Sequence, residues 1–210
     1  MNILCIDPAA SCGYCLVSVD GDVATIYEYG FIDIDESEYV GDRCIQLMDN
    51  IKQLIDSNNI EKVAVEDYFF SSRFATGSDV NVAFRTAIYI LCRQLNMHYE
   101  ILSVSGWKKF VCGRSTPTKE QKKKWGKSPA KKLMVQEALY IKYGFKFANH
   151  SLSKKTNKPI KFRYDIVDAV GQAVYYCKLI LNIPQVKNSV EIPPNENVKS
   201  IFNYGDYDGD

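Results

Sequence analysis

Short apolar runs and turn residues predict a strand-rich beginning of the chain. β-Rich runs at 2–7, 14–19 and 23–34 are separated by polar residues, and the Asp-Gly-Asp at 20–22 is typical of a hairpin turn. From 39 to 55 the apolar positions recur at spacings of three and four residues, as they do on one face of a helix. The pattern therefore predicts three strands followed by a helix.

Strands and helices then alternate. A buried run at 62–66 and a β-rich run at 99–104 predict two more strands, and helical spacing at 79–96 predicts a helix between them. A further helix is predicted at 164–181. Helices of this kind join parallel strands, so residues 1–181 are predicted to form one α/β domain in which the first and fourth strands are neighbours.

Three segments depart from this pattern. Two lysine-rich insertions, at about 113–128 and 149–163, lack an apolar period, and 116–127 within the first is predicted to be a mobile loop. The tail, 182–210, holds three of the seven prolines and ends in acidic residues, so we expect little of it to pack.

The composition is that of a globular protein. The 210 residues are 46% hydrophobic and 24% charged, and no run of eighteen apolar residues exists, which excludes membrane-spanning and wholly disordered chains. The net charge of +1 hides an asymmetry, because residues 103–163 contain 17 Lys and Arg against only Glu120 and Glu137. A basic segment of this size predicts a polyanionic partner.

The cysteines indicate a reducing compartment. The seven are scattered and mostly lie among apolar neighbours, as free buried thiols do. Cys12 and Cys15 have the spacing of a redox pair or half a zinc site, but no second pair exists and the only histidines are His98 and His150. The first apolar run is four residues long and ends in an acid, so we expect no signal peptide and a cytoplasmic location, in a bacterium or in the host cell of a phage or virus.

Four acidic residues lie where ligands bind in such a fold. Asp7 and Glu66 end the first and fourth strands, whose carboxyl ends are predicted to meet at one edge of the sheet. Asp165 and Asp168 are three residues apart near the start of the last helix and therefore share a face, which the small residue Gly171 would let approach the sheet closely. We expect the four carboxylates to form one cluster.

Each acid alone has a structural alternative. Asp7 precedes a proline as turn residues do, Glu66 could open a solvated loop, and Asp165 could complement a helix dipole. Together, four carboxylates about 5 Å apart would repel by about 3 kcal/mol per pair at an effective dielectric of ~20, so the cluster requires cations. Hard oxygen ligands predict Mg²⁺, with Mn²⁺ as a substitute, and two such ions about 4 Å apart suit in-line displacement at phosphorus.

Three motifs carry a resemblance to a known family. The segment "ILCIDPAASCGY" resembles the first-strand motif of RuvC-type Holliday-junction resolvases, "VAVEDYFF" looks like their second motif, and "DIVDAVGQAVYY" is similar to their closing helix. The resemblance implies an RNase H-like fold, a mixed five-stranded sheet in the order 3-2-1-4-5 flanked by helices. It also implies a homodimer that nicks four-way and other branched DNA in a Mg²⁺-dependent reaction. The long basic loops depart from the family's usual connections and look more like a phage or viral member.

The resemblance also implies residue roles. Asp7, Glu66, Asp165 and Asp168 would be the catalytic, metal-binding acids, and hydrolysis would leave 5′-phosphate and 3′-hydroxyl ends. Trp107 is expected to pack in the core. The resemblance implies DNA contacts by Lys108 in "GWKKFVCG", Lys132 in "SPAKKLMV" and Phe69 or Phe70 near the crossover. The basic charge of the segment, rather than the resemblance, adds the neighbours Lys109 and Lys131 and the insertion lysines Lys122, Lys123 and Lys124 as expected phosphate contacts.

Two alternatives remain. A non-catalytic architectural DNA-binding protein would explain the basic segment, and only the four acids argue against it, because carboxylates in a DNA-facing crevice weaken binding unless metals neutralise them. An actin-like or sugar-kinase-like ATPase also opens with a strand, an acid and small residues. It needs a second nucleotide-binding half with Gly-rich loops, for which 210 residues leave no room.

Overall fold

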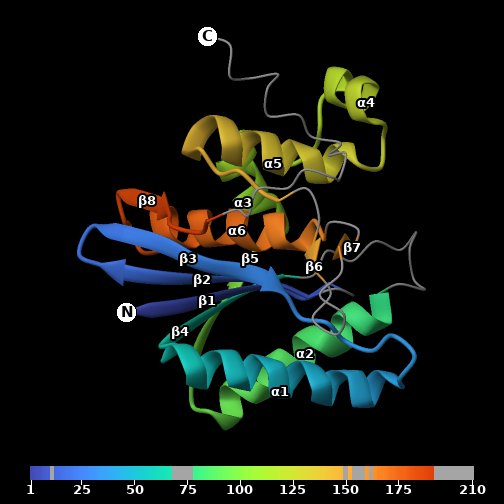
Figure 1. The fold of residues 1–210 in the computed structure, drawn as a ribbon, viewed down its shortest axis with the longest axis vertical. Coiled ribbons are helices and arrows are strands. Elements are labelled where there is room, and N and C mark those ends of the chain that lie inside the picture. The colour runs from blue at the N-terminus through green and yellow to red at the C-terminus, as the bar shows by residue number, and fades with distance from the viewer. Residues whose placement is uncertain (10–11, 68–77, 149–150, 153–158, 161–162, 192–210) are drawn as a thin grey trace.

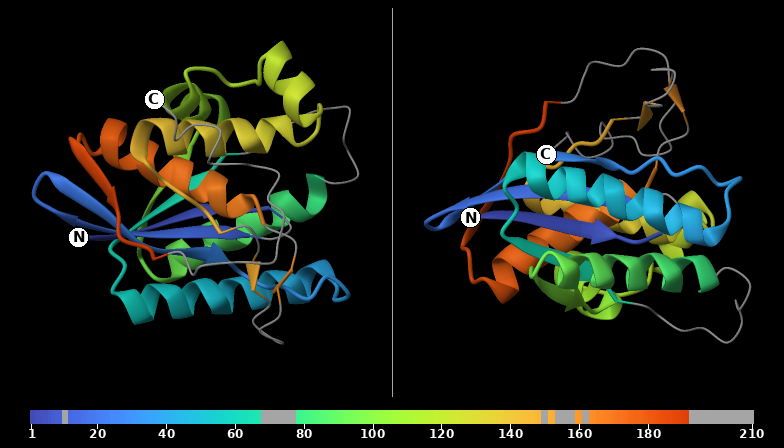
Figure 2. Two further views of the ribbon diagram at one scale, coloured as in Figure 1. Left: turned by 45° about the horizontal axis from the view of Figure 1, so that its top comes forward. Right: turned by 90° about the horizontal axis from the view of Figure 1, so that it is seen from below.

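A central six-stranded sheet with helices on both faces organises the molecule, as the computed structural model shows (Figure 1). Two further orientations show the same two helical layers (Figure 2). The structure describes residues 1–9, 12–67, 78–148, 151–152, 159–160 and 163–191.

The strand order confirms the prediction from sequence for five of the six strands. The order across the sheet is β5-β4-β1-β2-β3-β8, in which β1, β2 and β3 form an antiparallel meander and β4 lies parallel to β1 on its other side. The strands are β1 (Asn2–Asp7), β2 (Gly13–Asp20), β3 (Val23–Phe31), β4 (Lys62–Glu66), β5 (His98–Leu102) and β8 (Gln185–Asn188).

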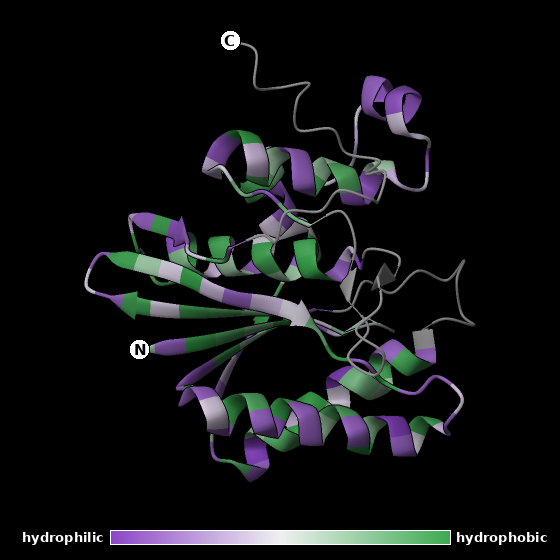
Figure 3. Ribbon diagram, viewed as in Figure 1, coloured by the Kyte–Doolittle hydropathy of each residue, from purple (hydrophilic) through white to green (hydrophobic). Residues whose placement is uncertain are grey.

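Each face of the sheet is covered by its own helices and its own apolar core. One core lies under α1 and α2 and the other under α6, α3 and α5, and the apolar sides of these helices contribute to them (Figure 3). The helices are α1 (Val40–Asn58), α2 (Ser78–Gln94), α3 (Val104–Cys112), α4 (Lys119–Trp125), α5 (Ala130–Tyr143) and α6 (Asp165–Tyr175), the last of which continues into a π-helical turn, η2 (Tyr176–Ile180).

The start of the expected tail packs, which corrects the prediction for 182–210. Strand β8 pairs in parallel with the first residues of β3, and Ile183, Val186 and Val190 pack against the core on the α6 side. The edge of β3 offers backbone groups for pairing, and the four residues of β8 pair with Val23–Ile26. Residues 192–210 lie outside the described part of the chain.

The first basic insertion contains a helix where a mobile loop was expected. Helix α4 has no buried residue, so it has no apolar period to detect. Its start is fixed locally by a capping box, in which the Thr118 hydroxyl accepts from the backbone N–H of Gln121 and the Gln121 side chain accepts from the backbone N–H of Thr118. The prediction from periodicity was wrong because capping, rather than burial, defines this helix.

The second basic insertion contains a two-stranded pair. Strands β6 (Ser151–Leu152) and β7 (Pro159–Ile160) are antiparallel. Most of the rest of 149–163 lies outside the described residues. Among the helices that the structure describes, none has the length and apolar character needed to span a membrane.

Candidate active site

Asp7 and Glu66 meet at the carboxyl ends of two neighbouring parallel strands. In the β1–β4 register Ile6 lies beside Val65, so the next residues on each strand are the two acids. Both are buried, with 6% of Asp7 and 8% of Glu66 exposed. This confirms the predicted position of the first two acids.

Helix α6 brings the other two acids over this edge. Asp165 and Asp168 lie in its first turn, and both act electrostatically on Asp7. The close approach depends on Gly13 of β2, where a Cβ atom would lie 2.2 Å from the backbone oxygen of Asp165. Gly171, expected to allow this approach, instead makes room for an indole, since a Cβ there would lie 2.7 Å from Cζ3 of Trp107.

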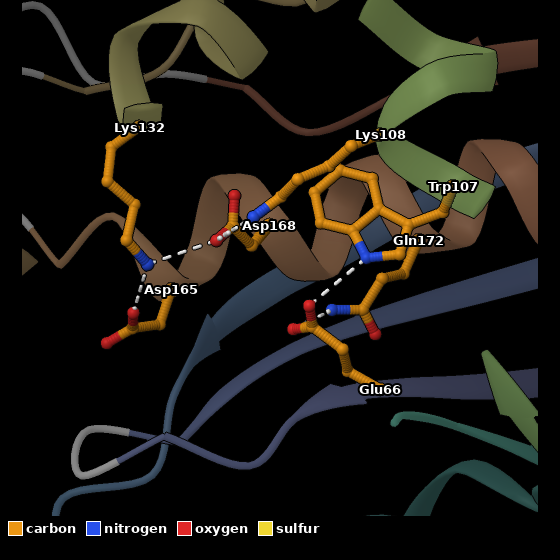
Figure 4. A network of polar contacts seen from close by, with 7 residues as sticks. All are labelled: Glu66, Trp107, Lys108, Lys132, Asp165, Asp168 and Gln172. Atoms are coloured by element: carbon orange, nitrogen blue, oxygen red, sulfur yellow. Dashed lines mark hydrogen bonds and ion pairs between the residues drawn. The ribbon is translucent and has the colours of Figure 1, made fainter. Parts of the chain in front are cut away.

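Two lysines neutralise the acids of α6 (Figure 4). The Lys132 ammonium of α5 donates to Oδ1 of Asp165 at 2.7 Å and to Oδ2 of Asp168 at 3.0 Å. The Lys108 ammonium of α3 lies 3.6 Å from the same Asp168 oxygen. Two of the seven lysines expected to touch DNA, Lys108 and Lys132, thus lie within the acid cluster.

Glu66 is held by a second set of contacts. Its Oε1 accepts from the indole N–H of Trp107 at 3.2 Å and its Oε2 from the side-chain amide of Gln172 at 3.1 Å. Its backbone oxygen accepts from Nε of Arg85 on α2 at 3.0 Å. Trp107 is fully buried, as expected from the sequence, but it also carries a polar contact to a candidate catalytic acid.

The electrostatics of the cluster follow from burial and from crowding of carboxylates. Burial, followed by the charge of Glu66, raises the pKa of Asp7 well above its ordinary value. Burial and then the charge of Asp168 raise the pKa of Glu66. Burial acts to lower the pKa of Lys132, but the surrounding carboxylates, Asp168 foremost, outweigh it and raise that pKa well above its ordinary value. The site therefore favours cations and resists additional negative charge.

The donor set fits a divalent cation by its chemistry. All four acids offer hard oxygen atoms, and Oδ1 of Asp168 is buried without a hydrogen-bond partner in the described part of the chain. Within those same residues no three acidic, histidine or cysteine side chains converge closely enough to hold an ion as they stand. Lys132 bridges the two acids of α6, so an ion would have to take over its contacts.

The other candidate lysines are not brought into the cluster. Phe69 and Phe70 lie outside the described residues. Lys109 and Lys131 are exposed on α3 and α5, and the three lysines Lys122, Lys123 and Lys124 are exposed on α4. Their contacts with DNA stay predictions.

The candidate thiol site lacks the properties of a reactive pair. Cys12 and Cys15 are fully buried free thiols, and burial raises the pKa of each well above its ordinary value. A raised pKa disfavours the thiolate that redox or zinc chemistry needs.

Comparison with known proteins gives the family. A family model described as crossover junction endodeoxyribonuclease RuvC matches residues 3–137, well over half of the chain. The chain belongs to the RuvC family. The match contains Asp7, Glu66, Lys108 and Lys132, and it ends before α6.

Bacterial RuvC proteins are similar over most of their length. The crossover junction endodeoxyribonuclease RuvC of Sulfurovum sp. is 32% identical over 124 residues, 58% of this chain and 76% of the relative. That of Dictyoglomus thermophilum is 27% identical over 143 residues, 68% of this chain and 84% of the relative. RuvC family nucleases depend on divalent metal ions.

The solved structures support the fold. Thermus thermophilus RuvC is 17% identical, with a TM-score of 0.56 over 85% of this chain and 96% of that chain. The same protein in complex with a Holliday junction substrate gives a TM-score of 0.57. The RNase H-like fold expected from the sequence is confirmed.

Gln172 is the site residue that the sequence analysis missed. It lies four residues after Asp168, and therefore on the same face of α6. The spacing of four residues from Asp168 is the feature of the sequence that points to Gln172. The feature is weak, because an amide carries no charge and the helix around it is apolar.

Proposed function

We propose that the four acids of this RuvC family member hold two Mg²⁺ ions and cleave branched DNA. Family membership gives the reaction class: the chain is a DNA endonuclease that resolves Holliday junctions. The observation that carries the assignment to residues is the meeting of two strand-end acids with two acids of the α6 first turn.

Each acid would have its own part in holding the ions. Asp7 interacts with the charges of all three other acids, so it would help to hold both ions. Glu66 would hold one ion, and Asp168 with Asp165 the other. When bound, such ions activate a water nucleophile and stabilise the charge that develops on the leaving 3′-oxygen, which gives 5′-phosphate and 3′-hydroxyl products.

The lysines would change partners during this process. Lys132 shares its ammonium between Asp165 and Asp168, so it would have to leave these carboxylates if they held an ion. The freed ammonium would then face the incoming DNA backbone as a phosphate contact. This exchange reconciles the position of Lys132 among the acids with its expected DNA-binding role.

The assembly and the compartment belong to the same proposal. A four-way junction presents two symmetry-related strands and each chain carries one acid cluster, which favours a homodimer. The seven free thiols are typical of proteins kept in a reducing cytoplasm.

The test uses Asp168→Asn, which removes one candidate ligand while keeping the shape of the side chain. Labelled four-way, three-way and linear duplex DNA are incubated with each protein in Mg²⁺ and in chelator. We expect the unmodified protein to nick the four-way junction in Mg²⁺ only, and the variant to bind the junction without nicking it. Nicking by the variant near the original rate would remove Asp168 from the site.

A further inference from the structure

Both carboxylate oxygens of Glu66 are engaged by donors from two different helices. Trp107 on α3 reaches Oε1 and Gln172 on α6 reaches Oε2 (Figure 4). Trp107 and Gln172 are fully buried, and Glu66 is 8% exposed. A buried carboxylate with a donor on each oxygen cannot rotate without breaking one of these bonds.

The two bonds leave Glu66 free to bind an ion. Each carboxylate oxygen can accept along two lone-pair directions, so the indole and the amide, one on each oxygen, do not by themselves fill its acceptor capacity. The two donors instead restrict rotation of the Glu66 carboxylate, because its plane is held by hydrogen bonds from the indole and from the amide.

The sequence around the two donors supports this arrangement. Gly171 provides the space that the indole occupies, since a Cβ at this position would lie 2.7 Å from the ring. The Lys108 ammonium lies 4.8 Å from the centroid of the same ring and 3.6 Å from Asp168. Gln172 follows Asp168 by one helical turn. Helix α6 therefore carries Asp168 itself and also contacts Glu66 through the side-chain amide of Gln172.

We propose that Trp107 and Gln172 are positioning residues, which hold the Glu66 carboxylate in the orientation that binds the divalent cation. This inference rests on the proposed function of the acid cluster, and it adds two residues that act through Glu66 without touching substrate. Hydrogen bonds to metal ligands commonly change metal affinity or activity by about 10- to 100-fold.

The experiment follows metal binding without DNA and without catalysis. Trp107 and Trp125 are the two tryptophans of the chain, so in a Trp125→Phe parent the emission comes from Trp107, directly beside Glu66. Titration with Mg²⁺ should give a saturable change in that emission. In the same parent, Gln172→Met should raise the Mg²⁺ midpoint by about 10- to 100-fold.

A matched control separates positioning from packing. Gln136 is also a buried glutamine, 3% exposed, but it lies on α5 rather than on α6 with Gln172, so Gln136→Met removes a comparable buried amide and should leave the Mg²⁺ midpoint unchanged. Trp107→Phe keeps an aromatic ring and removes the N–H, and titration calorimetry should show the same loss of Mg²⁺ affinity relative to Trp125→Phe. Urea unfolding of each variant checks that the fold is retained.

The outcomes distinguish this proposal from the proposed function. If the parent binds Mg²⁺ and nicks junctions while Gln172→Met and Trp107→Phe keep its midpoint, the positioning role is wrong and the function stands. A lower stability in urea with an unchanged Mg²⁺ midpoint also overturns the positioning role, because that result would assign the two hydrogen bonds to folding alone. If the parent neither binds Mg²⁺ nor nicks junctions, the proposed function fails and takes the positioning role with it.

Discussion

Substitution of Gly13 by alanine should damage both the fold and the active site. The added Cβ would lie 2.2 Å from the backbone oxygen of Asp165, 2.4 Å from its carbonyl carbon and 2.9 Å from the backbone nitrogen of Ile166, whereas ordinary contacts begin at 3.4 Å. All three atoms are backbone, so no side-chain rotation can relieve the overlap. The start of α6 must therefore move away from β2 by about 1 Å to restore normal contact distances.

The expected magnitudes follow from this displacement. Overpacking of a core costs about 1–3 kcal/mol, which lowers the urea midpoint of unfolding. A displacement of about 1 Å in a catalytic group lowers a rate by about 10²-fold, so single-turnover nicking of a four-way junction should fall by that factor. Junction binding should persist, because the exposed lysines of α3, α4 and α5 do not depend on this contact.

Gly41 provides the control. It lies in α1, and a Cβ there would meet nothing within 4 Å, so Gly41→Ala should keep the nicking rate and leave stability equal or higher by up to about 1 kcal/mol. If Gly13→Ala matched Gly41→Ala in urea midpoint and in nicking rate, α6 would not approach β2 as closely as described.

Three further predictions concern the charges of the molecule and its assembly. In the metal-free protein the pKa values of Asp7 and Glu66 are raised, so the folded state binds protons at these carboxyl groups more tightly than the unfolded chain does. The free energy of unfolding should therefore fall as pH rises from about 4 through the raised pKa values. Urea unfolding in chelator should give a lower midpoint at pH 8 than at pH 5, and Asp7→Asn should reduce the difference; equal midpoints would contradict the reasoning. Replacement of Lys122, Lys123 and Lys124 by alanine should flatten the slope of log K for DNA binding against log salt by about two to three units. The single-turnover nicking rate at saturating enzyme should stay unchanged. An unchanged slope would show that α4 is only a solvated surface. A supercoiled cruciform plasmid should yield linear product if two chains cut within one complex, and nicked circle alone would argue for independent monomers.

The sequence predicts the sheet because its strands carry strong local signals. The meander and the two crossover strands are apolar runs bounded by turn residues, and residues at their ends, Asp7 and Glu66, are placed correctly by topology alone. Strand β8 is not predicted from the sequence, because its four residues alternate only between exposed and half-buried positions and give a weak apolar signal. These residues form a strand because they pair with the edge of β3.

The contacts within the site are less accessible from the sequence. The positions of Lys108 and Lys132 among the acids depend on how α3 and α5 pack against α6, and a lysine in a basic segment is read first as a surface residue. The bond from Trp107 to Glu66 joins residues 41 positions apart. The large apolar ring of Trp107 predicts that it packs in the core but says nothing about where its N–H points.

The distance along the chain between the parts of the site determines when it can exist. The meander of β1, β2 and β3 is local and can form early, whereas Asp7 and Asp168 are 161 residues apart and meet only when α6 docks on the sheet. Lys108 and Lys132 precede α6 in the chain, so during synthesis the counter-charges emerge before the last two acids. Under the proposed assignment, chains that end before α6 lack two of the four acids, and recovery of DNA cleavage on refolding reports the long-range docking of α6.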